Sequence, residues 1–360
     1  MQNIDTYIRQ KKISLGEELS DRKLIYLDMN FWILLRKCYL DQAVSDESAM
    51  LYKLLKELVE KKKVLCPINH SVFTELLKQN DLQSRIDTAK VIDIFSNSVT
   101  LIFELERDNL ELQFYVNEKL LYKRNLKPKQ LLAWMKVPYS LGSAIPENDK
   151  IDPITQYEIQ SKFFDYTWSI TMEEMVRGYL RDRSLPFLSM TKTSNKLNTG
   201  KFAHQDDFRS LADLFNKELV GYLELFEDNC KEYFSYCKKE YPQVLQALEK
   251  EYSIKKPLDL CNRIKKDILG ATILDYLPNI FINVCIHTLM RWNKERKFKA
   301  NDLYDFQHAR AALPYFDFFF TEKSLQHLVM DKPYELYKKY NCTVESDINI
   351  INDILYEMTQ

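Results

Sequence analysis

The spacing of apolar residues changes twice along this chain of 360 residues. In the first hundred residues, continuous apolar runs at 24–28, 64–68 and 99–103 alternate with segments whose apolar residues recur every three or four positions. A continuous run is typical of a strand covered on both faces, and the wider spacing is typical of an amphipathic helix. This part of the chain is therefore predicted to be a doubly wound α/β unit.

From about residue 106 to residue 270, helical spacing is the main pattern that remains. Two sets of residues follow it: Ile159, Phe163, Tyr166 and Ile170, and then Phe208, Leu211, Phe215, Leu219 and Tyr222. The polar stretch 191–201 between them is expected to be an exposed loop. This region is predicted to be all-helical.

The α/β pattern returns after a helix expected at about 272–297. Further helices are predicted at 301–313, 321–329 and 347–357, and strands at 316–320 and 341–345. The simplest arrangement is one α/β domain split in sequence. Residues 1–105 would form its first part, 106–270 an inserted helical domain, and 271–360 the second part with a C-terminal helix.

Composition limits the binding chemistry. Apolar residues make up 46% of the chain, and the net charge at pH 7 is −1. This balance argues against strong nonspecific binding of nucleic acid unless basic residues gather locally, as they do at 61–63 and 291–299. The six glycines include no two close enough for a phosphate-cradling loop, which excludes Walker-type and dinucleotide-binding sites.

The seven cysteines form no CxxC pair, which predicts reduced thiols in a cytoplasm instead of a disulfide framework or a zinc site. The N-terminus has no apolar stretch like that of a signal peptide. The most apolar long segment, 270–292, carries polar groups that would be costly in lipid. We therefore expect a soluble, cytoplasmic protein without a membrane partner.

Acidic residues collect at one edge of the predicted sheet, where ligands of open parallel sheets bind. They are Asp28 at the end of the first strand, Glu75 in the helix after the second, Asp302 and Asp305 at the start of the helix before the fourth, and Glu322 directly after that strand. Clustered carboxylates are the ligands that Mg²⁺ and Mn²⁺ prefer. Such ions activate water and stabilise the leaving oxygen of a phosphodiester.

Three segments that carry these acids resemble the PIN-domain nucleases. They are LDMN at 27–30, HSVFTEL at 70–76, and DLYDFQHARAALPYFDFFFTEK at 302–323. The resemblance implies a PIN-like three-layer α/β/α core with a parallel sheet, split here by a large all-α insertion. It further implies an Mg²⁺ or Mn²⁺ site formed by Asp28, Glu75, Asp305 and Glu322, with Asn30 in a supporting position. The chain departs from the family in having Glu322 where Asp is usual, and in the insertion, which the small toxin-like members lack.

Several nearby polar residues have competing interpretations. Asp302 either takes part in catalysis or caps its helix, and Asp317 is expected to be structural. His308, one turn after Asp305, either orients substrate or water or is structural. His287 is expected in the core, whereas His70 and His204 show no pattern that indicates a partner.

The hypothesis that follows is a metal-dependent endoribonuclease that hydrolyses phosphodiester bonds, with a helical insertion that selects the substrate. The resemblance also suggests a toxin or phage-defence setting. RNA is the expected partner, DNA is a second candidate, and a protein partner or homo-oligomer stays open. The alternatives are a catalytically inactive PIN-like scaffold that binds RNA or protein, and a haloacid-dehalogenase-like phosphotransferase, although the latter family expects an Asp where this chain has Asn30.

Overall fold

The computed structural model describes residues 3–122, 127–178 and 190–360. The chain is mixed α/β with a parallel four-stranded sheet, and it divides into two compact units. The first unit comprises Met1–Glu104, Gln130–Leu188 and Ala311–Gln360, and the second comprises Leu105–Lys129 and Ser189–Arg310, as far as these ranges are described.

The sheet lies in the first unit and has the strand order β2-β1-β5-β6, with every neighbouring pair parallel. Its strands are β1 (Lys23–Leu27), β2 (Val64–Leu65), β5 (Phe318–Phe320) and β6 (Thr343–Glu345). Successive residues of a strand point to opposite faces, and the four residues 24–27 of β1 are all buried. Both faces of the sheet are therefore covered at β1, as the continuous apolar run predicted.

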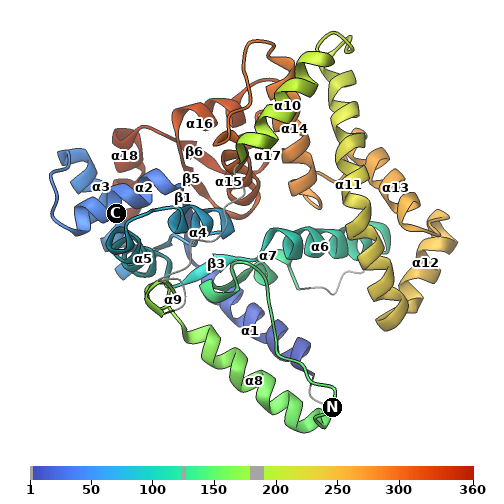
Figure 1. The fold of residues 1–360 in the computed structure, drawn as a ribbon, viewed down its shortest axis with the longest axis horizontal. Coiled ribbons are helices and arrows are strands. Elements are labelled where there is room, and N and C mark those ends of the chain that lie inside the picture. The colour runs from blue at the N-terminus through green and yellow to red at the C-terminus, as the bar shows by residue number, and fades with distance from the viewer. Residues whose placement is uncertain (1–2, 123–126, 179–189) are drawn as a thin grey trace. The chain divides into compact units, whose positions relative to one another are not determined.

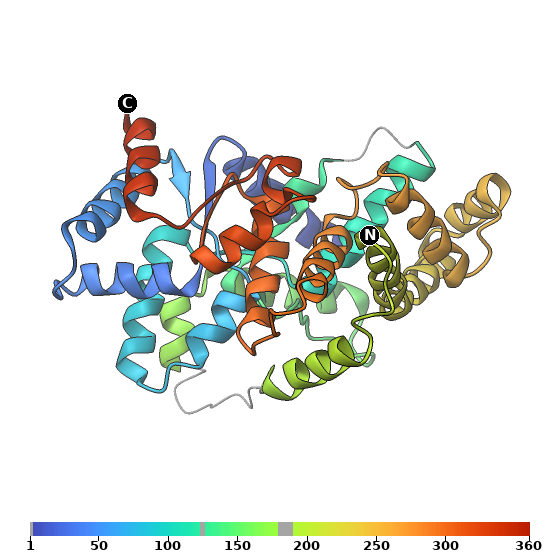
Figure 2. The ribbon, with the colours of Figure 1, turned by 90° about the horizontal axis from the view of Figure 1, so that it is seen from above.

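The first unit contains the helices α1 (Ile4–Leu19), α2 (Met29–Tyr39), α3 (Asp46–Glu60), α4 (His70–Leu77), α5 (Leu82–Ser96), α8 (Pro153–Ser169), α9 (Met172–Gly178), α16 (Lys323–Met330), α17 (Leu336–Lys339) and α18 (Ile348–Thr359). α3 packs against β2, and α2 packs against β1 and α5. α18 lies beside α3, so the C-terminal helix completes a layer begun near the N-terminus (Figures 1 and 2).

The segment expected to be the third strand mainly forms a separate antiparallel pair. In this pair, β3 (Val99–Leu101) lies beside β4 (Trp134–Lys136), and one parallel bridge from Thr100 to Ile68 links it to the chain after β2. β4 was not predicted, because it has three residues within a region of mainly helical spacing. The alternation of strand and helix therefore extends beyond residue 105.

The division into units also differs from the expected insertion at 106–270. Residues 130–178 belong with the sheet, and 271–310 belong with the helices of the second unit. A long-range contact shows why: α1 packs on β4 and α8, and a Cβ atom at Gly16 would lie only 2.4 Å from the carbonyl oxygen of Leu131. Such close approach between distant segments leaves no periodic signal in the sequence.

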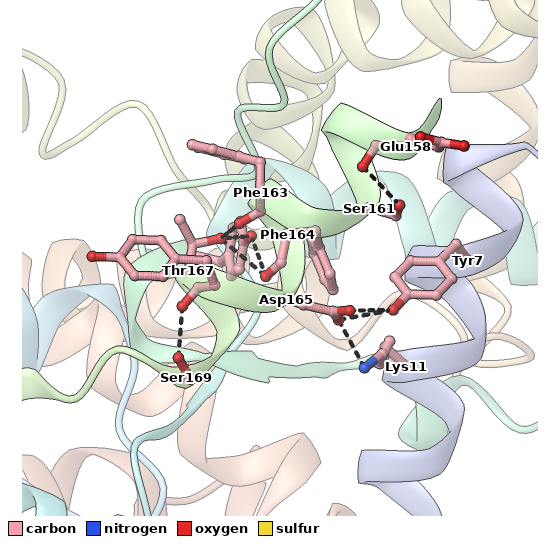
Figure 3. A network of polar contacts seen from close by, with 11 residues as sticks. Tyr7, Lys11, Glu158, Ser161, Phe163, Phe164, Asp165, Thr167 and Ser169 are labelled. Carbon is pink, nitrogen blue, oxygen red and sulfur yellow. Dashed lines mark hydrogen bonds and ion pairs between the residues drawn. The ribbon is translucent and has the colours of Figure 1, made fainter. Parts of the chain in front are cut away.

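α8 is fixed to α1 by a polar contact and an aromatic contact. Asp165 accepts a hydrogen bond of 2.7 Å from the hydroxyl of Tyr7 and pairs with Lys11 Nζ at 2.8 Å (Figure 3). The neighbouring Phe164 is fully buried and packs edge-on against the ring of Tyr7 in α1, with ring centroids 6.2 Å apart.

The apolar set that predicted this helix lies on its surface. Ile159, Phe163 and Tyr166 are 45%, 39% and 63% exposed. Helical spacing therefore identified the helix correctly, but α8 has two apolar faces and the inner one is the face that carries Phe164.

The second unit is helical. Its elements, three of which cross a boundary between units, are α6 (Glu104–Phe114), the π-helix Tyr115–Leu120, α7 (Lys129–Leu132), α10 (Met190–Ala203), α11 (Leu211–Glu240), α12 (Pro242–Tyr252), α13 (Pro257–Leu269), α14 (Pro278–Trp292) and α15 (Asp302–Tyr315). α11 packs against α13 and α14. Over the described ranges, no helix combines the length and apolar character that crossing a membrane requires.

The stretch 191–201 is part of α10, so the expected loop is wrong. Lys201 is only 7% exposed, and its ammonium group donates to the carbonyls of Met290, Asn293 and Arg296. The carbonyl groups at a helix C-terminus lack partners within the helix and favour a positive charge. Lys201 therefore supports the end of α14, a role that its polar sequence context concealed.

Candidate functional site

Asp28 lies where two parallel strands end side by side. Its backbone N–H donates to the carbonyl of Phe320 at 3.2 Å, and Leu27 is in register with Phe320. The Asp28 carboxylate caps α2 by accepting from the N–H groups of Asn30 at 3.0 Å and Phe31 at 3.4 Å. The side chain is buried, and the positive end of the α2 dipole favours its charged form.

Asn30 joins α2 to the end of β5. Its Nδ2 donates a hydrogen bond to Oε1 of Glu322, the exposed residue that precedes α16. The intervening Thr321 is buried, and its N–H donates to the carbonyl of Glu345 at 3.0 Å. Of the predicted site residues, Asp28, Asn30 and Glu322 are thus brought to one edge of the sheet.

Glu75 lies on α4, which follows β2. Asn69 caps α4 and also accepts a buried hydrogen bond of 2.7 Å from the hydroxyl of Tyr26 on β1. One turn beyond Glu75, Gln79 Nε2 contacts the sulfur of Met29 at 3.8 Å. These contacts fix α4 against β1 and the start of α2, so partly buried Glu75 belongs to a helix held beside Asp28.

Two other acids follow strands in this unit and were not selected from the sequence. Glu345 ends β6, where its Oε1 accepts from the N–H groups of Ser346 at 2.7 Å and Asp347 at 2.9 Å. Glu104 follows β3, and its carboxylate lies 3.6 Å from Nε2 of His70, for which no partner was predicted. The available signal was the one that identified Asp28, namely an acid soon after a short strand.

Asp302 and Asp305 are in the second unit, in the first turn of α15. The Asp302 carboxylate accepts from the N–H of Lys299 at 2.8 Å, so it holds the chain that enters the helix. Asp305 is partly exposed, and His308 one turn later is buried. The four expected metal ligands are therefore distributed over both units.

Among the residues that the structure describes, no three His, Cys, Asp or Glu side chains gather in an arrangement suited to a metal ion. The chemistry of Asp28 and Glu322 nevertheless fits a hard divalent cation. Both side chains carry carboxylate oxygens, the ligands that such ions prefer. The amide of the neighbouring Asn30 donates a hydrogen bond to the Glu322 carboxylate.

Asp317 has the structural role that was predicted. Its carboxylate pairs with Lys23 Nζ at 2.7 Å and accepts from the N–H of Leu24 at 2.9 Å. These contacts tie the starts of β1 and β5 together at the edge opposite Glu322.

His287 is half-buried beside two aromatic rings, so it lies at the border of the core in which it was predicted. Its ring centroid lies 5.8 Å from that of Phe298 and 5.4 Å from that of Phe306. Burial, and next the guanidinium groups of Arg310 and Arg291, lower the pKa of His287 from 6.5 to about 4.

Part of the basic run at 291–299 is already compensated within the second unit. Arg291 pairs with Glu218, and Lys294 Nζ pairs with Asp206 at 2.7 Å. These two residues are therefore weaker candidates for phosphate contacts than the charge pattern predicted.

Comparison of the chain with protein-family models, curated proteins and solved structures gives no match.

Proposed function

We propose that the chain is a PIN-like, divalent-metal-dependent nuclease that acts as an endoribonuclease. The observation that carries the proposal is the Asn30–Glu322 hydrogen bond beside Asp28, at the ends of the parallel strands β1 and β5. The LDMN and TEK segments that carry the family resemblance are the segments joined by this contact. A three-layer α/β/α PIN-like core is part of the same proposal.

In this mechanism, Asp28 and Glu322 hold Mg²⁺ or Mn²⁺, and Asn30 orients the Glu322 carboxylate. A bound ion supplies an activated water and stabilises the negative charge on the leaving oxygen. Glu75 and Asp305 are the further ligands that the resemblance implies. Neighbouring carboxylates repel one another, and a divalent cation bound between them would offset this electrostatic repulsion.

The test is a cleavage assay on mixed single-stranded and structured RNA and on DNA, with Mn²⁺ and with a chelator. We expect internal cleavage of RNA that the chelator abolishes. Asp28→Asn, Glu322→Gln and Asp305→Asn should each lower the rate by roughly 100-fold or more, because each removes a charged ligand. Strong residual cleavage in purified, folded Asp28→Asn and Asp305→Asn would refute the assigned site.

Asp317→Asn is the matched control, because it changes an acid at the other end of β5. This variant should retain cleavage at temperatures where it is folded. Metal-independent RNA binding without cleavage would instead indicate an inactive scaffold. Release of phosphate from a phosphomonoester, lost in Asp28→Asn, would indicate the phosphotransferase alternative.

The biological setting that we propose, a toxin or a phage-defence nuclease, rests on the family resemblance alone. Induced expression in a bacterial host should arrest growth with the wild-type chain and not with Asp28→Asn. Equal growth of the two cultures, with equal protein levels, would contradict that setting but not the nuclease activity.

A further inference from the structure

Two cysteines from different helices meet in the interior of the second unit. Cys230 lies on α11 and Cys261 on α13, and their sulfur atoms are 3.5 Å apart. The two residues are 0% and 4% exposed. α11 and α13 pack against each other over an extended contact, which holds the two thiols in place.

The pair is chemically asymmetric. When Cys261 ionises, the Cys230 thiol donates a hydrogen bond to the thiolate, which lowers the pKa of Cys261 and raises the pKa of Cys230. Burial and the nearby Glu227 oppose the Cys261 thiolate, and Lys231 favours it, but the hydrogen bond is the largest cause and the pKa of Cys261 is lowered. Cys261 is therefore the better nucleophile of the two.

Two other buried cysteines differ from this pair. Burial raises the pKa of Cys66 and of Cys342, without the thiol hydrogen bond that lowers the pKa of Cys261. A zinc site at Cys230 and Cys261 would need further ligands, and the described residues contain no group of three suitable side chains. A dithiol with only two close sulfur atoms is suited to reversible oxidation instead.

We propose that Cys230 and Cys261 form a redox site at which a peroxide creates a reversible disulfide between α11 and α13. The Cys261 thiolate attacks a peroxide oxygen, the O–O bond breaks, and Cys261 becomes a sulfenic acid while the peroxide is reduced to water. The Cys230 thiol then attacks the Cys261 sulfur, forms the S–S bond and releases a second water. Two thiols thus lose two electrons and two protons in all.

The geometry requires only a small movement. Closing the contact from 3.5 Å to the S–S bond length of about 2.05 Å needs side-chain rotation and a slight approach of the helices. The resulting bond encloses α12 in a covalent loop. Because a disulfide restricts the unfolded chain, oxidation should raise the thermal stability of this unit.

The experiment uses the full chain, reduced, freed of reductant and treated with hydrogen peroxide. Remaining thiols are alkylated after denaturation, and the digest is analysed by mass spectrometry without reduction. We expect one peptide pair linked through Cys230 and Cys261, which dithiothreitol separates. We also expect a higher unfolding temperature in the oxidised protein, reversed by dithiothreitol.

Cys237→Ser is the matched control, since Cys237 is another buried cysteine of α11. This variant should still form the linked pair, whereas Cys261→Ser should leave Cys230 open to alkylation. Phenylarsine oxide, which bridges two close thiols, provides a test that requires no oxidant. Phenylarsine oxide should bind across Cys230 and Cys261 both in the wild-type chain and in Cys237→Ser.

Two results would overturn the proposal. The first is alkylation of both Cys230 and Cys261 in peroxide-treated wild-type protein, together with no arsenical bridge between them. The second is a disulfide that joins Cys230 to another cysteine in the folded chain. Both results are read on the wild type and do not depend on how well Cys261→Ser folds.

Discussion

The side-chain amide of Asn30 donates a hydrogen bond to Oε1 of Glu322, a residue 292 positions later in the chain. The contact forms because β1 and β5 are parallel neighbours in register, so that the residues after Leu27 and Phe320 emerge at the same edge of the sheet. A polar contact between two segments that carry the family resemblance is therefore a direct result of strand order.

Replacing Asn30 with Asp should make this edge dependent on a cation. The substitution removes the donor and places a second negative charge beside Glu322, which should lower the stability by about 1 kcal/mol at neutral pH. Mn²⁺ should restore more stability to Asn30→Asp than it adds to Asn30→Ala, which lacks the donor but adds no charge. Thermal denaturation with and without Mn²⁺ measures the difference, and equal effects of the ion would contradict the prediction.

Tyr26→Phe should loosen α4 without changing the apolar core. The lost hydroxyl donates a buried hydrogen bond of 2.7 Å to Asn69, the capping residue of α4. We expect a loss of about 1–2 kcal/mol in the free energy of unfolding and, if Glu75 contributes to the site, slower RNA cleavage. Urea denaturation tests the first effect. Tyr356→Phe, at a residue that is 59% exposed, is the control and should leave both properties unchanged.

Lys201→Met should strongly destabilise the second unit. The variant keeps the apolar stem but leaves the carbonyls of Met290, Asn293 and Arg296 without the charged donor. We expect a loss of about 3 kcal/mol, measured by urea denaturation. Lys196→Met changes an exposed lysine of the same helix and should cost much less. Similar stabilities of the two variants would show that the buried ammonium is not needed.

His287 should make stability fall as the pH falls below about 6.5. Burial is the first cause, and Arg310 and Arg291 the next, of a folded-state pKa lowered from 6.5 to about 4. Between these values the unfolded chain binds a proton that the folded chain excludes, so acid favours unfolding. Between pH 6.5 and pH 5 the contribution is about 2 kcal/mol.

His287→Phe should remove that part of the pH dependence while an aromatic ring is kept beside Phe298 and Phe306. Urea denaturation at pH 7, 6 and 5 provides the comparison. A wild-type curve parallel to that of His287→Phe over this range would contradict the prediction.

The elements that depend on contiguous residues could be predicted. The run LIYLD predicted β1, and α18 begins within one residue of its expected start. The positions of the acids after β1 and β5 were predicted because the carboxyl ends of parallel strands meet at one edge of a sheet. The two-unit division and β4 could not be predicted in this way. They depend on contacts such as that between Gly16 and Leu131, which are separated by more than a hundred residues.

By itself, the sequence determined where most helices and strands form, because those choices depend on neighbours within a turn or a strand. It also determined which acids stand at strand ends, including Asp28 and Glu322. Only the tertiary structure decided that Phe164, and not Phe163, lies on the buried face of α8, and that the ammonium group of Lys201 is buried. Burial is set by what packs against a residue, and in these cases the partners come from distant parts of the chain.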